Sequence, residues 1–498
     1  MQLKELLKDI PYQLVRGNLE VEIKDICYDS RDYQKKDVFV CLVGIDTDGH
    51  KYIEDVIKRG CQVIITSKEV DVNDNDITVI RVDDTRRKLP YLSANLFHHP
   101  ADKLIKIAIT GTKGKTSTSW MIKNILESAQ EKVGVIGTIG TIIDGKITSH
   151  KNTTPESYLV QKYMRKMVNA GVKYLIMEAS SQALWVGRIQ NIVFDYGIFT
   201  NLSIDHVGPR EHASYEDYAN SKALLFKQCK VGIFNQDDME FTRMTKEATC
   251  EILTYGKKKK SNLIIKEVSP IHENDFLGTK LQTEGVIQDD FLISSPGDFS
   301  AYNAAAAILL ANTLKINIRY IKEGLQTFQV PGRLQIFNIN NRFKVVIDFA
   351  HNKLSMESVI QTMRKYRVNR IITLFGCGGG RSYDRRVELG CISGKLADLS
   401  IITTDNPRWD DVHLINADIK KGIESVGGKY LIIEDRKEAI LYALNHAKER
   451  DVILLLGKGH ENFQEIKGIK YDFNETEIIK TYLKGENAND ESIKLSKL

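Results

Sequence analysis

The run Gly111-Thr112-Lys113-Gly114-Lys115-Thr116 has the residue types of a phosphate-binding loop. Its glycines let backbone N–H groups approach phosphate oxygens, its second lysine adds positive charge, and its last threonine offers a hydroxyl to magnesium. A compact apolar run, residues 105–110, precedes the loop, and a helical pattern follows from about Thr116 to Ser128. Because strand, loop and helix come in the order that phosphate binding requires, we predict a nucleotide site over 111–117, Ser117 included, rather than a glycine-rich turn.

Three side chains downstream could bind a metal ion. Glu178 ends an apolar strand-like run, His206 follows Thr200-Asn201-Leu202-Ser203-Ile204-Asp205, and Lys222 lies in a helical pattern. Open α/β sheets bind ligands at the carboxyl ends of their strands, where a carboxylate suits magnesium. Taken singly, Glu178 also fits a solvated strand end, His206 a core or surface histidine, and Lys222 a surface lysine. The prediction depends on their order along the chain.

The loop and these three residues together resemble motifs of the Mur ligases and the folylpolyglutamate synthetases. The resemblance implies an ATP-dependent ligase that activates a carboxylate as an acyl phosphate and joins it to an amine. Its catalytic residues would be Lys115, Lys222, His206 and Glu178. It further implies that two Mg²⁺ ions bind through Thr116, Glu178, His206 and a carbamate formed on Lys222. A carbamate replaces the ammonium, which would repel the metal ions, with an oxygen anion.

Three motifs farther along resemble nucleotide-binding segments of the same family. Asn303 stands at a helix start that the family places beside the adenine. Pro331-Gly332-Arg333 and Asp348-Phe349-Ala350-His351 resemble segments that approach ATP from another domain, so closure would exclude water from the acyl phosphate. The implied ATP site comprises Gly111, Thr112, Lys113, Gly114, Lys115, Thr116, Ser117, Asn303, Arg333, Asp348 and His351.

The amino-terminal segments resemble the UDP-binding region of some Mur ligases, which folylpolyglutamate synthetases lack. Asp29-Ser30-Arg31 and the run from Phe39 to His50 carry this resemblance. It implies that the chain binds UDP-N-acetylmuramoyl-L-alanyl-D-glutamate, a precursor of peptidoglycan, through Ser30, Asn152, Thr153, Thr154, Ser181 and Arg188. Hydroxyls, an amide and an arginine suit a substrate dense in phosphate and carboxylate.

The amine acceptor is suggested by motifs near the carboxyl end. Asp405-Asn406-Pro407-Arg408 resembles the signature of Mur ligases that add meso-diaminopimelate, whose carboxylate an arginine can bind bidentately. The resemblance implies an amino-acid site made of Arg386, Asp405, Asn406, Pro407, Arg408, Gly457 and Glu461. Without the resemblance, Asn-Pro would indicate only a turn.

Several departures from the family pattern leave alternatives open. Gly380 and Ser382 stand where the family has acidic residues, Asn352-Lys353-Leu354 replaces a Thr-Pro-Asp-like run, and Gln182 replaces a frequent histidine. The acceptor could therefore be L-lysine or another diamino acid such as lanthionine. A folylpolyglutamate-synthetase-like ligase and a catalytically silent nucleotide-binding paralogue also remain possible.

Composition restricts the partners. The 498 residues carry a formal charge of +5, too balanced for a nucleic-acid binder that depends on neutralising phosphates. Seven scattered cysteines form no Cys-x-x-Cys pair, and no run of about 18 apolar residues occurs. We expect a cytoplasmic bacterial enzyme without membrane insertion or bound nucleic acid, acting as a monomer.

The alternation of strands and helices predicts an α/β protein of three domains with mainly parallel sheets. We expect a small UDP-substrate-binding α/β domain over 1–100, a central ATP-binding domain of P-loop ATPase type over 101–333, and a Rossmann-like amino-acid-binding domain over 334–498. A helical run from Ala304 to Phe328 and the turn at Pro331-Gly332 would lead into the third domain.

Overall fold

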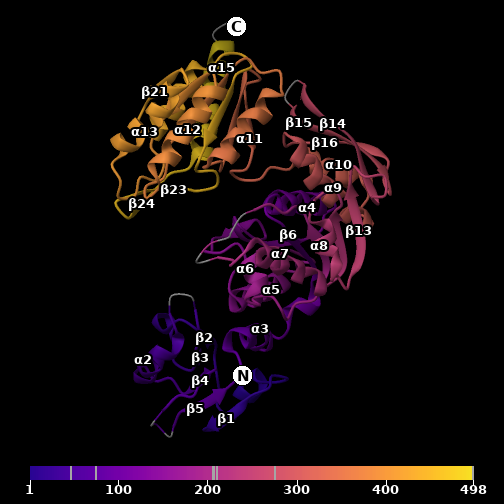
Figure 1. Cartoon of the computed structure of the whole chain (residues 1–498), viewed down its shortest axis with the longest axis vertical. Helices are drawn as coiled ribbons and strands as arrows, with labels where there is room; N and C mark the ends of the chain where they lie inside the picture. Colours follow the sequence, from indigo (N-terminus) through magenta and orange to yellow (C-terminus); the bar gives the residue numbers. More distant parts are fainter. Residues whose placement is uncertain are drawn as a thin grey trace. The chain divides into compact units, whose positions relative to one another are not determined.

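The computed structural model describes residues 1–44, 47–72, 74, 76–204, 208, 211–273 and 276–495, with side chains as far as residue 485 (Figure 1). The chain forms two compact units by its own contacts. The first comprises Met1–Ile265, Thr283–Gln288 and Tyr302–Gly324, and the second comprises Lys266–Gln282, Asp289–Ala301 and Leu325–Leu498. The predicted domain boundaries at 100/101 and 333/334 stay predictions. Among the described helices, none is long and apolar enough to cross a membrane.

The amino-terminal part of the first unit is a five-stranded sheet in the order β1-β5-β4-β3-β2. Its strands are β1 (Gln13–Arg16), β2 (Ile26–Cys27), β3 (Val38–Val40), β4 (Val63–Thr66) and β5 (Thr78–Arg81). β2 to β5 pair in parallel, while β1 is antiparallel to β5. The short helix α2 (Ile53–Lys58) and the longer α3 (Thr85–Leu96) accompany the sheet, and Asp84 caps α3 by accepting from two backbone N–H groups.

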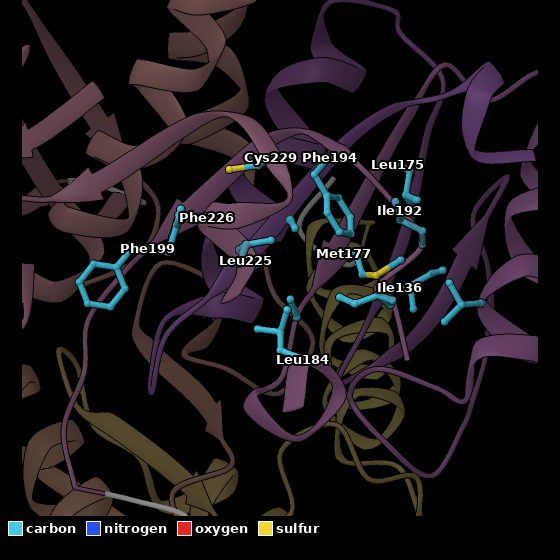
Figure 2. Packing of buried hydrophobic residues seen from close by; sticks show 14 of the residues in the cluster. Ile136, Leu175, Met177, Leu184, Ile192, Phe194, Phe199, Leu225, Phe226 and Cys229 are labelled. Carbon is cyan, nitrogen blue, oxygen red and sulfur yellow. The ribbon is translucent and has the colours of Figure 1, made fainter. Parts of the chain in front are cut away.

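The central part of the first unit is built on parallel strands in the order β13-β12-β11-β6-β10-β7, within a sheet of 11 strands. The strands are β6 (Ile105–Thr110), β7 (Val133–Gly137), β10 (Tyr174–Glu178), β11 (Phe194–Phe199), β12 (Cys229–Asn235) and β13 (Glu251–Gly256). Helices α4 (Lys115–Ser128), α5 (Ser157–Asn169), α6 (Ser181–Trp185), α7 (Tyr215–Ala223) and α8 (Phe241–Lys246) connect them. Buried residues such as Met177, Phe194 and Phe226 form one core cluster (Figure 2).

Strand register brings the expected site residues to one edge of this sheet. β6 and β10 pair so that Ile109 lies opposite Glu178, and β6 and β11 pair so that Thr110 lies opposite Phe199. The residues that follow these strands, including the phosphate loop and Thr200, therefore gather at the carboxyl edge. This is the edge where open α/β sheets bind ligands.

The helical run predicted from Ala304 to Phe328 is two helices, and in that respect the prediction is wrong. The structure has α9 (Asp298–Thr313) and α10 (Ile318–Thr327). Lys315 adopts the left-handed conformation, with φ 59°, which ends α9. Asn317 then accepts a side-chain hydrogen bond from the N–H of Arg319, as a cap of the next helix does. The preceding strands β14 (Leu263–Glu273), β15 (Phe276–Gly285) and β16 (Asp289–Ile293) were not predicted.

The carboxyl-terminal part of the second unit is a six-stranded sheet in the order β17-β18-β22-β19-β20-β21. Its strands are β17 (Gln335–Ile339), β18 (Phe343–Asp348), β19 (Ile371–Phe375), β20 (Leu399–Ile402), β21 (Tyr430–Ile432) and β22 (Val452–Leu456). All pair in parallel except β17. Its helices are α11 (Lys353–Arg364), α12 (Tyr383–Leu396), α13 (Val412–Ser425), α14 (Arg436–His446) and α15 (Glu475–Leu495), and a hairpin joins β23 (Phe463–Ile466) to β24 (Ile469–Asp472). The predicted α/β fold with mainly parallel sheets is confirmed.

A buried ion pair connects α14 and α15 to the end of β22. Arg436 at the start of α14 donates to Glu475 at the start of α15 over 2.8 Å, and both side chains are at most 1% exposed. Arg436 also donates to the carbonyl of Leu456 at the end of β22 over 2.9 Å. Burial raises the pKa of Glu475, and the neighbouring guanidinium opposes this. The pair thus ties two helices to the strand that leads into Gly457.

We expect Arg436→Leu to lower the stability of this part of the chain by about 3–5 kcal/mol, because it leaves Glu475 buried without its counter-charge. Urea denaturation followed by circular dichroism measures the loss. Lys480→Leu is the control, since Lys480 pairs with Glu477 on the surface of α15, where an ion pair contributes about 0–1 kcal/mol. Equal losses in the two variants would contradict the importance of the buried pair.

Candidate active site

The phosphate loop is shaped by two glycines in positive-φ conformations. Gly111 has φ 147° and Gly114, the residue before α4, has φ 86°. A Cβ atom at Gly111 would lie 2.0 Å from Oγ1 of Thr200, and one at Gly114 would lie 2.4 Å from Oδ1 of Asn303. The loop therefore needs glycine at both positions, and it turns β6 directly into the amino-terminal end of α4. That end presents N–H groups and a positive dipole to an anion.

The segment after β11 holds the loop in place. The N–H of Thr112 donates to the carbonyl of Asn201 over 2.8 Å, and the N–H of Lys113 donates to Oδ1 of Asn201 over 3.0 Å. Thr200 and Asn201 in turn donate to the carbonyl of Lys113 over 2.7 and 3.0 Å. The Lys115 ammonium donates to the carbonyls of Gly111 and Thr112 over 2.8 and 3.0 Å. Lys115 thus lies over the loop that is expected to bind phosphate.

Glu178 is buried at the end of β10 and accepts three hydrogen bonds. Oγ1 of Thr116 donates to it over 3.0 Å, and Thr138 donates twice, from its N–H over 3.0 Å and from its hydroxyl over 2.9 Å. The structure therefore brings together Thr116 and Glu178, two of the four expected metal ligands. His206 lies outside the described residues, as does the neighbouring Asp205.

Lys222 is buried on α7, with 1% of the residue exposed, so the surface-lysine alternative is wrong. Its ammonium donates to the carbonyl of Gly111 over 3.0 Å and lies 4.5 Å from the ring centre of Tyr218. The hydroxyl of Tyr218 lies 3.0 Å from Oγ1 of Thr112. A helix far along the chain therefore places Lys222 directly behind the phosphate loop.

A cavity of about 270 Å³ unites the loop with the expected UDP-substrate residues. Its lining residues are Lys115, Lys151, Asn152, Thr153, Ser180, Ser181, Gln182, Arg188, Glu211 and Lys222. Four of the six residues expected to bind the UDP substrate are in this set. Ser30 is not among the described residues that line it, and neither is Thr154, which is fully buried and donates to the carbonyl of Glu178 over 2.7 Å.

Arg188 is fixed in this cavity by an acidic partner. Its Nε lies 3.3 Å from Glu156, and its Nη1 donates to the carbonyl of Thr154 over 3.1 Å. Glu156 also pairs with Arg86 over 3.0 Å, which links the cavity to α3 of the amino-terminal sheet. The guanidinium is thereby oriented in advance for an anionic ligand.

A second, smaller cavity of about 100 Å³ lies at the carboxyl edge of the sheet in the second unit. It is lined by Phe349, His351, Gly376, Cys377, Gly378, Arg381, Arg385, Asp405, Asn406, Arg408, Gly457 and Glu461. Most of the residues expected to bind the amino-acid substrate are among these lining residues. The set combines three guanidinium groups with two carboxylates, which suits a ligand that carries both carboxylate and ammonium groups.

Arg408 is held in an unusual backbone conformation beside this cavity. Its φ of 55° is in the left-handed region, and its N–H donates to the carbonyl of Glu465 over 3.0 Å. The guanidinium donates to the carbonyl of Gly379 over 3.2 Å and lies 3.3 Å from the carboxylate of Glu465. A Cβ atom at Gly379 would lie 1.9 Å from the carbonyl of Pro407, so only glycine fits beside this segment.

Arg386 does not line the cavity; its guanidinium pairs with Asp410 and, over 3.2 Å, with Asp418. Asp410 also accepts from the N–H of Gly380 over 3.0 Å. Gly380 has φ 70°, so this departure from the family pattern lies in a turn that favours glycine. Arg381 and Arg385, which sequence reasoning did not select, line the cavity instead.

The expected nucleotide residues of the second unit lie at the end of β18. Asp348 is buried and accepts from the N–H groups of Leu334 and Ala350 over 2.8 Å each. Burial raises the pKa of Asp348, while the nearby Arg333 opposes this rise. The Arg333 guanidinium lies 4.7 Å from the ring centre of Phe349. Burial lowers the pKa of His351, and its Nδ1 lies 2.7 Å from the carbonyl of Phe349.

The sequence analysis did not select two residues that position other parts of the structure, Thr138 and Asn352. Thr138 follows β7, which is the parallel neighbour of β10, so its place beside Glu178 could have been inferred from strand pairing. Asn352 gave no such signal, yet it caps α11 by accepting from the N–H of Ser355 over 3.0 Å. Asparagine and threonine both serve as caps, so the change at 352 keeps a structural role.

Three family models match successive parts of the chain. The Mur ligase family, catalytic domain, matches residues 22–97; the Mur ligase middle domain matches residues 109–311; and the Mur ligase, glutamate ligase domain matches residues 332–459. The resemblance inferred from the motifs is thereby confirmed.

Curated relatives match over almost the full length. UDP-N-acetylmuramoyl-L-alanyl-D-glutamate:2,6-diaminopimelate ligases of Caldanaerobacter subterraneus and Clostridium perfringens are each 39% identical, covering 97% and 98% of this chain and 99% and 100% of their own. A solved structure of a ligase with the same name is 27% identical and covers 98% of this chain and 99% of its own, with a TM-score of 0.72. These matches show that this chain belongs to the Mur ligase family.

Proposed function

We propose that this chain is an ATP-dependent ligase that joins meso-diaminopimelate to UDP-N-acetylmuramoyl-L-alanyl-D-glutamate in the bacterial cytoplasm. The relatives named for this reaction support the proposal, since they match nearly the whole chain. The observation that carries it is the cavity in which Lys115 and Lys222 stand beside Asn152, Ser181 and Arg188. Side chains that can bind a phosphate, a carboxylate and a polar substrate therefore line the same cavity.

The residues around the loop fit ATP and magnesium. The N–H groups before α4 and the Lys115 ammonium suit the terminal phosphates, and Asn303 packs against Gly114 beside them. Thr116 and Glu178, 3.0 Å apart, offer the hard oxygen ligands that Mg²⁺ prefers. Bound magnesium would neutralise charge on the phosphates during transfer. Thr138 would orient Glu178 toward it.

The proposed reaction has two steps. An oxygen of the D-glutamyl side-chain carboxylate attacks the γ-phosphorus of ATP, and the bond to ADP breaks, which gives an acyl phosphate. The diaminopimelate amine then attacks the acyl carbon, loses a proton and expels phosphate. Because the substrates supply both nucleophiles, the chain contributes positioning and fixed charge. Lys115 stabilises the transferring group, and Arg188 holds the anionic substrate.

We also propose that Lys222 is carbamylated, which extends its buried side chain with an anion beside the metal ligands. Its burial and its position beside the loop that carries Thr116 support this role. The amine would add to CO₂ and release a proton. The carbamate would complement Thr116, Glu178 and His206 as metal ligands.

At the acceptor end, the proposal assigns Arg408 to a carboxylate of diaminopimelate and Glu461 to the ammonium at its far end. Asp405, Asn406, Pro407 and Gly457 would shape this site, and Arg386 would act by ordering the turn at Gly380 through Asp410. Ser30, Arg333, Asp348 and His351 remain predictions as substrate or nucleotide contacts.

The function predicts that phosphate release requires ATP, the UDP-linked dipeptide and a diamino acid together. We expect meso-diaminopimelate to support the fastest turnover when lysine and lanthionine are offered in parallel. Lysine lacks the second carboxylate that Arg408 would bind, and lanthionine has that carboxylate but carries a larger sulfur atom in place of the central methylene. A coupled assay for phosphate measures each rate. Release that does not depend on the dipeptide would refute the assignment, and a preference for lysine would refute the acceptor.

Carbamylation predicts a ¹³C NMR signal from a carbamate after the protein is incubated with ¹³C-bicarbonate. We expect Lys222→Arg to abolish the signal and to lower kcat on the order of 10²–10³-fold, as loss of a charge-stabilising group does. Lys115→Arg is the matched control and should keep the signal while losing activity. A signal that persists in Lys222→Arg would place the carbamate elsewhere.

The acceptor assignment predicts that Arg408→Ala raises KM for meso-diaminopimelate about tenfold to a hundredfold, because a hydrogen bond between charged groups contributes about 1.5–3 kcal/mol. Steady-state kinetics at saturating ATP and dipeptide measures the change. KM for lysine, which lacks the second carboxylate, should change little. An unchanged KM for diaminopimelate would remove Arg408 from the site.

A further inference from the structure

Lys458 is a fully buried cation behind the acceptor cavity, and the proposed function gives it no role. Its side chain is 0% exposed, and its ammonium donates to Oδ1 of Asn406 over 3.1 Å and to Oε2 of Glu461 over 3.5 Å. Oδ1 of Asp405 lies 4.0 Å away. Burying a lysine is costly, as its lowered pKa reflects, so a buried ammonium is retained where it compensates other charges.

The groups around Lys458 form one connected network. Asn406 accepts from Lys458 and from the N–H of Glu465 over 3.0 Å, and its Nδ2 donates to Oε2 of Glu461 over 2.8 Å. The ring centre of Phe463 lies 5.7 Å from the ammonium. The buried pair Arg436–Glu475 also acts on Lys458 electrostatically, since Arg436 lowers the pKa of Lys458 and Glu475 raises it. The direct ion-pair partners of the ammonium are the two carboxylates, Asp405 and Glu461.

The two carboxylate oxygens of Glu461 differ in their contacts. Both Asn406 and Lys458 bind Oε2, and within the described part of the chain no hydrogen bond reaches Oε1. Glu461 lines the acceptor cavity, as do Asp405 and Asn406. A carboxylate anchored by one oxygen keeps a fixed orientation and can accept a hydrogen bond at the other.

Asp405 and Glu461 both lie close to the Lys458 ammonium, at 4.0 and 3.5 Å. Both carboxylates also line the acceptor cavity. The ammonium between them offsets the repulsion of two like charges. Lys458 therefore fixes Glu461 through Oε2 and balances negative charge beside it.

We infer that Lys458 is a positioning residue of the acceptor site, which fixes Glu461 so that Oε1 receives the distal ammonium of the diamino acid. The inference rests on the proposed function and deepens it. The cavity can then select an acceptor by the group at its far end, because the Glu461 carboxylate that binds the distal ammonium is itself held by the buried Lys458. Lys458 touches no reacting atom.

A double-mutant cycle with Glu461 tests the inference. We expect Lys458→Met to raise KM for meso-diaminopimelate about tenfold or more, the effect of losing a charged hydrogen-bond partner, with KM for ATP unchanged. In a Glu461→Gln background the same change should alter KM less than about twofold, because the carboxylate that Lys458 positions is gone. Effects that multiply in the double variant would overturn the inference.

An acceptor without the distal amine provides a second readout. With 2-aminopimelate, which has one amine, Lys458→Met and the wild type should show the same KM, whereas a general distortion of the cavity would raise it. Lys458→Gln, which keeps a donor without a charge, replaces the methionine variant if circular dichroism shows that the latter is unfolded. Phosphate release by the wild-type protein that does not depend on the dipeptide would refute the proposed function. If the wild type is active as proposed but the KM effects of the two substitutions multiply in the double variant, only the role of Lys458 is refuted.

Discussion

The close approach of the phosphate loop to its neighbours is the constraint on which the first site depends. Gly111 has no room for a Cβ atom beside Thr200, and Gly114 has none beside Asn303. Because the loop packs so tightly, the carbonyl of Gly111 is reached by both Lys115 and Lys222. A side chain at Gly111 would displace Thr200 and Asn201, which hold the loop, and one at Gly114 would displace Asn303. The backbone of the loop thus organises cations that arise more than 100 residues apart, as the sequence shows.

The second site depends on a different solution, in which several cations are paired within the chain. Arg408 is anchored by Glu465, Arg386 by Asp410 and Asp418, and Lys458 by Asn406 and Glu461. Such pairs fix side chains at known orientations, which lowers the entropy lost when a ligand binds. The first site presents backbone N–H groups and lysines, whereas the second presents guanidinium and carboxylate groups. The difference matches the two substrates proposed for them.

Much of this arrangement could be predicted from sequence because it follows strand ends. The strand predicted over 105–110 is β6, the strand-like run that ends at Glu178 is β10, and the motifs at their ends meet at one edge. Features that depend on a single dihedral angle or on tertiary contact could not be predicted. The left-handed Lys315 splits a uniformly helical pattern, and the strands over 263–293 lack strong alternation. Lys458 lies between Gly457 and Glu461, two of the expected site residues, but only packing shows that it is buried and what it contacts.

The departures from the family pattern bear on which part of the chain sets acceptor choice. Gly380 occupies a positive-φ turn whose N–H donates to Asp410, and Asn352 caps α11. Both positions serve the backbone, so their changes leave the cavity lining intact. Arg408, Asn406 and Glu461 retain both the identities of the diaminopimelate signature and a connected hydrogen-bond network. Discrimination between diamino acids is therefore expected to follow the charges that line the cavity, which are those of this network together with Arg381 and Arg385, because these charges meet the charged groups of the acceptor.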